Sequence, residues 1–202
     1  LTDDEAVDLL SRLGHAEAVI ASRWPESKLE PSLDRIRAVM DLLGDPQRAF
    51  PVIHLAGTNG KTSTARMIES LLRSFGLRTG LFTSPHLHSV RERIRLDGEP
   101  IDVERFVKVY EDVRPYVGIA DATSERDGGP RLSFFEVMTA VAYAAFADAP
   151  VDVAVVEAGM GGAWDATNVA DGTVAVVTPI DLDHMDYLGP TITAIAGEKA
   201  GI

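Results

Sequence analysis

The fold is decided by residues 51–62, Pro-Val-Ile-His-Leu-Ala-Gly-Thr-Asn-Gly-Lys-Thr. A short apolar run of strand type leads into a turn with glycines at 57 and 60, and residues 62–75 then carry apolar side chains at helical spacing. Glycines let backbone N–H groups turn inward around phosphate oxygens, and the helix N-terminus adds its positive dipole end. The stretch predicts a phosphate-binding loop in which Lys61 reaches the β and γ phosphates and a hydroxyl faces Mg²⁺. The alternative interpretation is a glycine turn with an exposed lysine.

Segments of helix and strand type alternate on both sides of this loop. We expect strands at residues 51–56, 77–83, 151–156 and 173–177, a small hairpin around residues 94–98, and helices at residues 3–22, 31–43, 62–75, 102–117, 132–147 and from 191. Residues 121–130 read as a polar loop. This alternation predicts an α/β fold with an open, mostly parallel sheet and flanking helices. Ligands are expected at the edge of the sheet where parallel strands end.

Composition narrows the class of protein. The 202 residues contain 31 Asp and Glu against 19 Lys and Arg, giving a formal net charge of −12, and no cysteine. An acidic chain argues against a nucleic-acid partner, and the absence of cysteine excludes disulfides and thiolate zinc sites. No apolar run is long enough for a transmembrane helix. We expect a cytoplasmic monomer that binds small molecules, with neither a nucleic-acid nor a membrane partner.

Five motifs, in order along the chain, carry a resemblance to a known family. The loop Gly-Thr-Asn-Gly-Lys-Thr (57–62) resembles the ATP-binding loop of the Mur ligase family. Four others look like the folylpolyglutamate synthase and dihydrofolate synthase branch of that family: Thr-Ser-Pro-His-Leu (83–87), Glu-Ala-Gly-Met-Gly-Gly running into Asp-Ala-Thr-Asn (157–168), Asp-His-Met-Asp-Tyr-Leu-Gly (183–189) and Glu-Lys-Ala-Gly-Ile (198–202). Two positions depart from the family pattern, Ala163 where arginine is expected and Thr62 where many relatives have glycine.

The resemblance implies a function and a domain assignment. It implies an ATP-dependent amide ligase of folate biosynthesis and one-carbon metabolism that uses ATP and two Mg²⁺ ions. The ligase would add L-glutamate to a folate, to dihydropteroate, or to both, through an acyl phosphate, and would release ADP and phosphate. Residues 1–202 would be an ATP-binding domain, incomplete at its C-terminal end, with residues 1–50 as a helical extension and a glutamate-binding domain absent. Another Mur-type amino-acid ligase, and a nucleotide switch or ATPase without ligase activity, remain as alternatives.

Candidate nucleotide and metal residues follow from the motifs. The ATP loop comprises Gly57, Thr58, Asn59, Gly60, Lys61, Thr62 and Ser63. Glu157 ends an otherwise apolar strand, where a buried acid needs a compensating cation, and Mg²⁺ fits beside a phosphate loop. The resemblance adds Ser84 as a second ligand of that ion and His184 as a ligand of a second one. It also implies that Lys199 forms a carbamate with CO₂ and ligates metal, and that Lys61, His184 and Lys199 are catalytic.

The organic substrate is assigned from three matched segments. The resemblance places a pterin or folate against Leu29, Glu30, Pro31 and Ser32, against Ser133, Phe134 and Phe135, and against Trp164 and Asp165. Aromatic rings suit stacking on a flat pterin. Because Phe134 and Phe135 are expected on a helix, at least one of the two should belong to the core.

Overall fold

The computed structural model describes residues 2–25 and 30–202. Within them, six strands form one sheet in the order β4-β3-β2-β5-β1-β6. Their bounds are β1 (Val52–Ala56), β2 (Thr79–Phe82), β3 (Ile94–Leu96), β4 (Glu99–Pro100), β5 (Val153–Glu157) and β6 (Val174–Val177). Strands β2, β5, β1 and β6 run parallel, and β3 and β4 add an antiparallel edge. The predicted open, mostly parallel sheet is confirmed.

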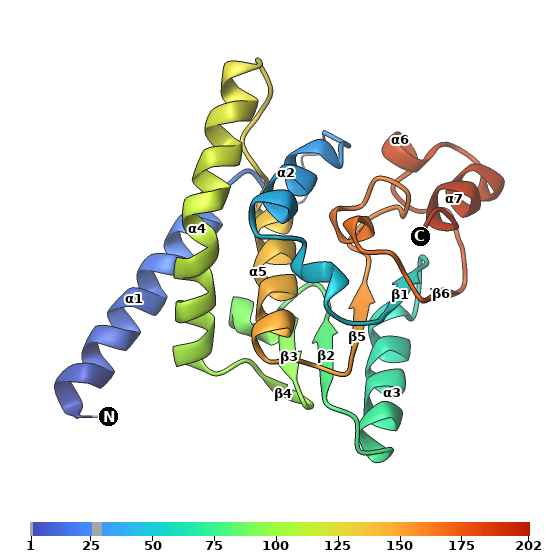
Figure 1. Ribbon diagram of the computed structural model, residues 1–202. Coiled ribbons are helices and arrows are strands. Elements are labelled where there is room, and N and C mark those ends of the chain that lie inside the picture. Colours follow the sequence, from blue (N-terminus) through green and yellow to red (C-terminus); the bar gives the residue numbers. More distant parts are fainter. Residues whose placement is uncertain (1, 26–29) are drawn as a thin grey trace.

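Helices cover both faces of this sheet (Figure 1). They are α1 (Asp3–Ala21), α2 (Asp34–Leu42), α3 (Lys61–Ser74), α4 (Val103–Arg126), α5 (Phe134–Asp148), α6 (Met185–Leu188) and α7 (Ile192–Lys199), with 3-10 turns η1 (Pro46–Arg48), η2 (Val90–Arg93) and η3 (Ala166–Val169). Helix α3 packs on one face, around Leu55, Leu81 and Val155. The larger core lies on the other face, where α1, α2, α4 and α5 gather.

One expectation is wrong, because residues 121–126 belong to α4 rather than to a loop. Asp121, which reads as polar and exposed, is only 1% exposed. Its carboxylate accepts a hydrogen bond from the backbone N of Leu132 at 2.7 Å and pairs with Arg23 at 2.8 Å. These partners come from distant parts of the chain, so the helix continues where the local sequence suggests a break.

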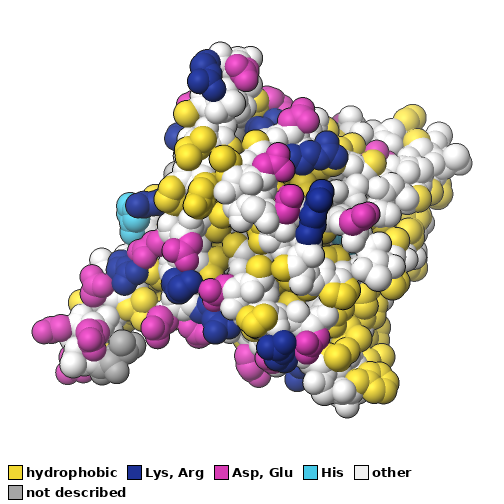
Figure 2. Space-filling model, in the orientation of Figure 1, with side chains coloured by type: hydrophobic (Ala, Val, Ile, Leu, Met, Phe, Trp, Pro, Cys, Tyr) yellow, Lys and Arg dark blue, Asp and Glu magenta, His cyan; other side chains and the backbone are white. Residues whose placement is uncertain are grey.

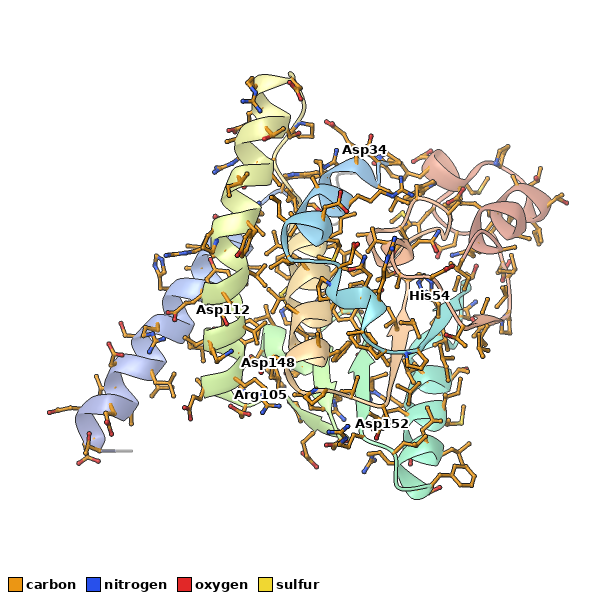
Figure 3. The ribbon with its side chains drawn as sticks, viewed as in Figure 1. Asp34, His54, Arg105, Asp112, Asp148 and Asp152 are labelled. Atoms are coloured by element: carbon orange, nitrogen blue, oxygen red, sulfur yellow. The ribbon has the colours of Figure 1, made fainter. Side chains whose placement is uncertain are left out.

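Apolar side chains remain uncovered along one side of the molecule. Met67, Leu71 and Phe75 of the α3 segment are exposed, as are Val174 and Val177 of the edge strand β6. Figure 2 shows this apolar band beside α3 and β6, whereas charged side chains crowd α1 and α4. Figure 3 shows Arg105 and Asp112 on α4 and Asp148 on α5 in that charged region. No helix in residues 2–25 and 30–202 is long and apolar enough to cross a membrane.

Candidate active site

The predicted phosphate loop lies between β1 and α3. Gly57 has φ +148°, and a Cβ there would sit 1.9 Å from the Thr178 hydroxyl oxygen, so only glycine fits. Gly60, in the left-handed region at φ 82°, caps α3, which begins at Lys61. The first N–H groups of a helix have no partner within the helix. At this turn the free N–H donors and the positive dipole end of α3 therefore face the same loop. The loop can therefore hold an anionic group such as a phosphate.

Two lysines from different helices meet at this loop. Lys61 Nζ donates to the Gly57 carbonyl oxygen at 3.0 Å, and Lys199 Nζ at the end of α7 donates to the same oxygen at 2.9 Å. Lys199 is only 2% exposed. Burial lowers the pKa of its ammonium group, and the nearby charge of Lys61 lowers it further. The site thus holds one lysine cation next to an amine that burial makes easier to deprotonate.

Glu157 faces the first turn of α3. Side chains alternate along β5, so Glu157 shares a face with Val155, which packs against α3. Its two carboxylate oxygens each accept from the Thr62 hydroxyl at 2.9 Å, and one accepts from the Ser84 backbone N at 3.3 Å. Burial raises the pKa of Glu157, and these hydrogen bonds and the charge of Lys61 oppose that rise only partly.

The donor set around Glu157 fits a hard divalent cation. The carboxylate is buried, at 2% exposure, and no lysine, arginine or histidine nitrogen of the described residues lies within ion-pair distance of it. Hydroxyl oxygens of Thr62 and Ser84 stand beside it as further hard ligands, which is the chemistry that Mg²⁺ prefers. Nowhere in the described residues, this site included, do three or more His, Asp or Glu side chains form a cluster that could hold a metal ion.

His184 lies apart from these groups. It takes a left-handed backbone conformation, φ 47°, just before α6, and its Nε2 is 3.5 Å from Asp183 Oδ2. Its side chain is 45% exposed. The negative charge of Asp183 nevertheless acts on Lys199, because it opposes part of the lowering that burial imposes on the pKa of that amine. The loop carrying His184 is therefore near Lys199, although neither a hydrogen bond nor an ion pair joins these two described residues.

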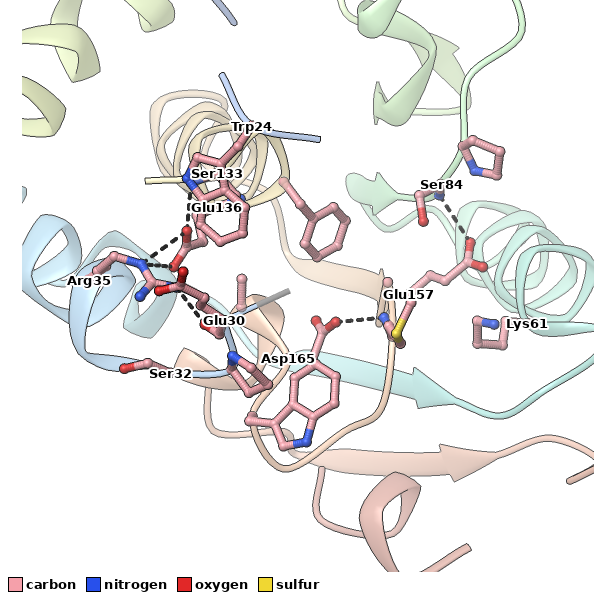
Figure 4. Close-up of a pocket in the computed structure, with 17 residues that line it drawn as sticks. Trp24, Glu30, Ser32, Arg35, Lys61, Ser84, Ser133, Glu136, Glu157 and Asp165 are labelled. Carbon is pink, nitrogen blue, oxygen red and sulfur yellow. Dashed lines mark hydrogen bonds and ion pairs between the residues drawn. The ribbon is translucent and has the colours of Figure 1, made fainter. Parts of the chain in front are cut away.

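A cavity of about 310 Å³ opens beside the loop. Lys61, Ser84 and Glu157 form its phosphate end (Figure 4). The other walls are formed by residues from α2 and α5, from the segments that precede these helices, and from the loops that follow β2 and β5: Trp24, Glu30, Pro31, Ser32, Arg35, Pro85, Ser133, Phe135, Glu136, Gly159, Met160, Trp164, Asp165 and Ala166. Seven of the nine residues that we predicted for the organic substrate thus line one cavity with the phosphate end.

The other two predicted substrate residues do not line it. Leu29 lies outside the described residues. Phe134 is not among the lining residues, since neighbouring positions on a helix point about 100° apart and Phe135 occupies the wall. Its ring stacks on His86, with ring centres 6.3 Å apart, and lies 4.9 Å from the guanidinium carbon of Arg93. Arg93 itself is only 2% exposed.

An ion pair that the sequence did not reveal shapes the wall far from the phosphate end. Arg35 Nε donates to Glu136 at 3.0 Å, with both side chains at most 10% exposed. Arg35 also donates to the Glu30 carbonyl oxygen at 2.8 Å and lies 5.5 Å from the centre of the Trp24 ring. The pattern Ser133-x-x-Glu136 signals a capping box, which the structure contains. Nothing in the sequence pairs Arg35 with that glutamate.

Asp165 is held in the wall by backbone donors. Its side chain accepts from the backbone N of Met160 at 2.8 Å and of Thr167 at 2.9 Å. The residue is 3% exposed, and burial raises the pKa of its carboxyl group while these hydrogen bonds oppose the rise. Three aromatic rings, those of Trp24, Phe135 and Trp164, also line the cavity. Such a wall suits a flat heterocycle that carries hydrogen-bond donors.

Comparison with known proteins gives one consistent result. The Mur ligase middle domain family matches residues 55–202. The chain is 57% identical over 204 residues to the dihydrofolate synthase/folylpolyglutamate synthase of Mycobacterium tuberculosis, covering 100% of this chain and 41% of that relative. The corresponding Bacillus subtilis protein is 41% identical over 187 residues, covering 90% and 43%.

Solved structures similar to this chain come from proteins of the same kind as the relatives above. Mycobacterium tuberculosis folylpolyglutamate synthase complexed with ADP and AMPPCP has a TM-score of 0.87 and 55% identity, over 96% of this chain and 42% of that one. E. coli FolC in complex with DHPP and ADP has a TM-score of 0.80 and 36% identity, over 96% and 43%. The chain spans about two fifths of the length of these relatives.

Proposed function

The chain belongs to the Mur ligase family, and from that premise we propose that the protein is an ATP-dependent amide ligase that adds L-glutamate to a folate, to dihydropteroate, or to both. One observation carries the proposal. The phosphate loop, the buried acid Glu157 and an aromatic-lined wall open into a single cavity, so a nucleotide phosphate and an organic carboxylate can meet there. Relatives with 57% and 41% identity carry the name dihydrofolate synthase/folylpolyglutamate synthase.

Residues 57–63 would hold the β and γ phosphates of ATP, with Lys61 supplying the positive charge. Glu157, Thr62 and Ser84 would hold Mg²⁺, supported by their buried oxygen donors. When bound, Mg²⁺ neutralises charge on the phosphoryl group being transferred. A carboxylate oxygen of the organic substrate attacks the γ-phosphorus, and the bond to the ADP oxygen breaks. The amine of glutamate then attacks the acyl carbon, loses a proton, and phosphate leaves.

The organic substrate would lie along the aromatic wall with its carboxylate toward Lys61. Phe135, Trp164 and Trp24 offer faces for a pteridine ring, and Asp165 offers acceptor oxygens for its N–H groups. Glu30, Pro31 and Ser32 line the same cavity, and Arg35 holds the Glu30 carbonyl oxygen, which fixes that segment over the opening. This orientation leaves the phosphate end free for the group that reacts.

We extend the proposal to Lys199 and His184. A carbamate forms when a neutral amine attacks CO₂ and loses a proton, so a buried lysine with a lowered pKa is suited to it. The carbamate oxygen and the imidazole of His184 would be ligands of a second Mg²⁺ ion. The influence of the Asp183 charge on Lys199 supports placing the two residues in one site.

We also propose that residues 1–202 act as one ATP-binding unit in the cytoplasm. The helices of residues 1–50 pack directly on α4 and α5, which supports treating them as part of that unit. The use of ATP and the lack of cysteine support the compartment.

Acceptor dependence of ATP turnover tests the proposed function. ADP formation by the full-length protein is measured with glutamate and either dihydropteroate, tetrahydrofolate or no acceptor, and products are identified by mass spectrometry. We expect ADP and a glutamylated product only when an acceptor is present. ADP formation that ignores the acceptor would indicate an ATPase or nucleotide switch. Turnover confined to a different carboxylate and amino acid would indicate another Mur-type ligase.

A further inference from the structure

A chain of buried polar side chains runs behind the cavity wall, from Asp165 to strand β1. The Thr167 hydroxyl donates to Asp165 Oδ1, the oxygen that also accepts from the Thr167 backbone N at 2.9 Å. On the other side of Thr167, His54 Nε2 lies 2.7 Å from the same hydroxyl oxygen. His54 and Thr167 are both 0% exposed. Figure 3 labels His54 on β1.

The positions of the hydrogens in this chain follow from counting donors. The Thr167 hydroxyl has one hydrogen. If that hydrogen is donated in a hydrogen bond to Asp165, the hydrogen bond between Thr167 and His54 must use an N–H on Nε2 of His54 as its donor. That arrangement leaves His54 Nδ1 as a bare acceptor, and Nδ1 is indeed buried without a partner among the described groups. The reverse order needs a protonated Asp165 and an N–H on Nδ1, which would be a buried donor with no acceptor.

Other contacts favour the same arrangement. Both carboxylate oxygens of Asp165 already face backbone N–H groups, which stabilise the ionised form. Burial lowers the pKa of His54 to about 4, so its ring is neutral near pH 7. Two further titratable groups are close enough for their charges to interact with that of Asp165. The first is the Tyr143 hydroxyl of α5, whose pKa burial raises well above its usual range. The second is the Lys199 amine of α7.

We propose that His54 is a positioning residue for the organic substrate: acting through Thr167, it holds Asp165 as an ionised hydrogen-bond acceptor in the cavity wall. This inference rests on the proposed function for one point, that the substrate contacts Asp165. The ligand that such an acceptor selects carries neighbouring N–H donors, as the amino-pyrimidine end of a pteridine does. A protonated Asp165 would present an O–H there and bind that edge poorly.

The state of His54 can be measured without any activity. In ¹⁵N NMR spectra of the full-length protein, the His54 signals are assigned by their loss in His54→Gln. We expect a neutral Nε2–H tautomer throughout the range from pH 6 to pH 9. A Thr167→Val variant should lose this tautomer preference because the acceptor is gone. A His54 that is charged, or protonated on Nδ1, at neutral pH would overturn the proposal.

Kinetics test the link to the substrate. We expect His54→Leu to raise KM for dihydropteroate or tetrahydrofolate about tenfold at pH 7, the effect of weakening a hydrogen bond to a charged group. KM should depend on pH more steeply than in the wild type and fall as the pH rises, because loss of the His54 donor raises the pKa of Asp165, whereas KM for ATP should change less than about twofold. His54→Gln places an amide donor near the Nε2 position and should restore a KM close to that of the wild type.

Tyr143→Phe is the matched control for a purely structural role. It removes the 2.6 Å hydrogen bond from Tyr143 to the Thr167 carbonyl oxygen, so it loosens the same turn but leaves the proton chain intact. We expect a lower Tm with an unchanged dependence of KM on pH. A His54→Leu protein whose KM profile matched that of wild type would overturn the proposal. A wild-type protein that formed no ADP with either substrate would instead refute the proposed function and the substrate half of this inference, while NMR would still decide the state of His54.

Discussion

Replacing Glu157 with glutamine separates the need for a metal ligand from the need for a stable fold. The amide keeps the shape of the side chain and its hydrogen bonds, because its oxygen accepts from the Ser84 N–H and its NH₂ donates to the Thr62 hydroxyl oxygen. It removes a buried negative charge that no cation of the described residues pairs with. We therefore expect the nucleotide-free Glu157→Gln protein to be at least as stable as the wild type.

In contrast to its effect on the stability of the nucleotide-free protein, Glu157→Gln should strongly weaken the binding of Mg²⁺ and ATP. Losing one partner of a buried charge pair costs about 3–5 kcal/mol, which weakens Mg²⁺-dependent ATP binding by a factor of order 100 or more. A ligand at about 100 times its Kd stabilises a protein by about 2.7 kcal/mol, and at its Kd by only about 0.4 kcal/mol. The rise in Tm caused by Mg²⁺ and ATP should therefore drop about sevenfold, in proportion to that stabilisation.

The assay is thermal unfolding of the full-length protein with and without Mg²⁺ and ATP. Glu136→Gln is the matched control, because Glu136 lines the same cavity but pairs with Arg35. It should lower the stability of the nucleotide-free protein, since it leaves a buried arginine without its carboxylate, and should keep the rise in Tm with Mg²⁺ and ATP. A Glu157→Gln protein that responded to Mg²⁺ and ATP as the wild type does would refute the metal assignment.

Three further predictions follow from the same geometry. Gly57→Ala should lose about 1–3 kcal/mol of stability, measured by denaturant unfolding, because its Cβ would meet the Thr178 hydroxyl at 1.9 Å; an unaffected protein would contradict the loop geometry. His54 has a folded pKa of about 4 against 6.5 for the free side chain, so its contribution to stability is complete above about pH 6.5 and is lost as the pH falls to about 4, by roughly 3 kcal/mol. Unfolding curves from pH 4 to pH 7 should show this loss in wild type and not in His54→Gln. Lys199→Ala should abolish turnover, and short carboxylic acids should partly restore it; no rescue, together with an unmodified Lys199 in mass spectra of the active protein, would count against the carbamate.

Local chemistry made much of the fold predictable from sequence. The strand–loop–helix around Lys61 has signals that act over a few residues, namely two glycines, an apolar run and helical spacing, and the structure follows them. The hairpin at Asp97-Gly98 was predicted in the same way and is present as β3 and β4. The C-terminal part of α4 was missed, because a buried Asp121 with distant partners looks like a loop residue to any local pattern.

The residues of the candidate site also fall into those that a sequence signal could find and those that no such signal marks. Family motifs led to Asp165 and Trp164, and a capping pattern could have led to Glu136. No such signal exists for Arg35, which joins α2 to α5 across 101 positions of sequence, or for His54, which reads as one more residue of a buried strand. Contacts of this kind depend on which helices share a face of the sheet, and that is decided by the packing of the whole chain.

The oxygen balance of the reaction tests the central claim most directly, that a nucleotide phosphate and an organic carboxylate react in one cavity. The organic substrate is labelled with ¹⁸O in the carboxylate that accepts glutamate, and the full-length protein converts it in unlabelled water with ATP and L-glutamate. Phosphoryl transfer to that carboxylate, followed by attack of the amine on the acyl carbon, leaves one labelled oxygen on the phosphate. The account predicts one ¹⁸O atom in each phosphate released. Phosphate without ¹⁸O, formed together with the amide product, would contradict it.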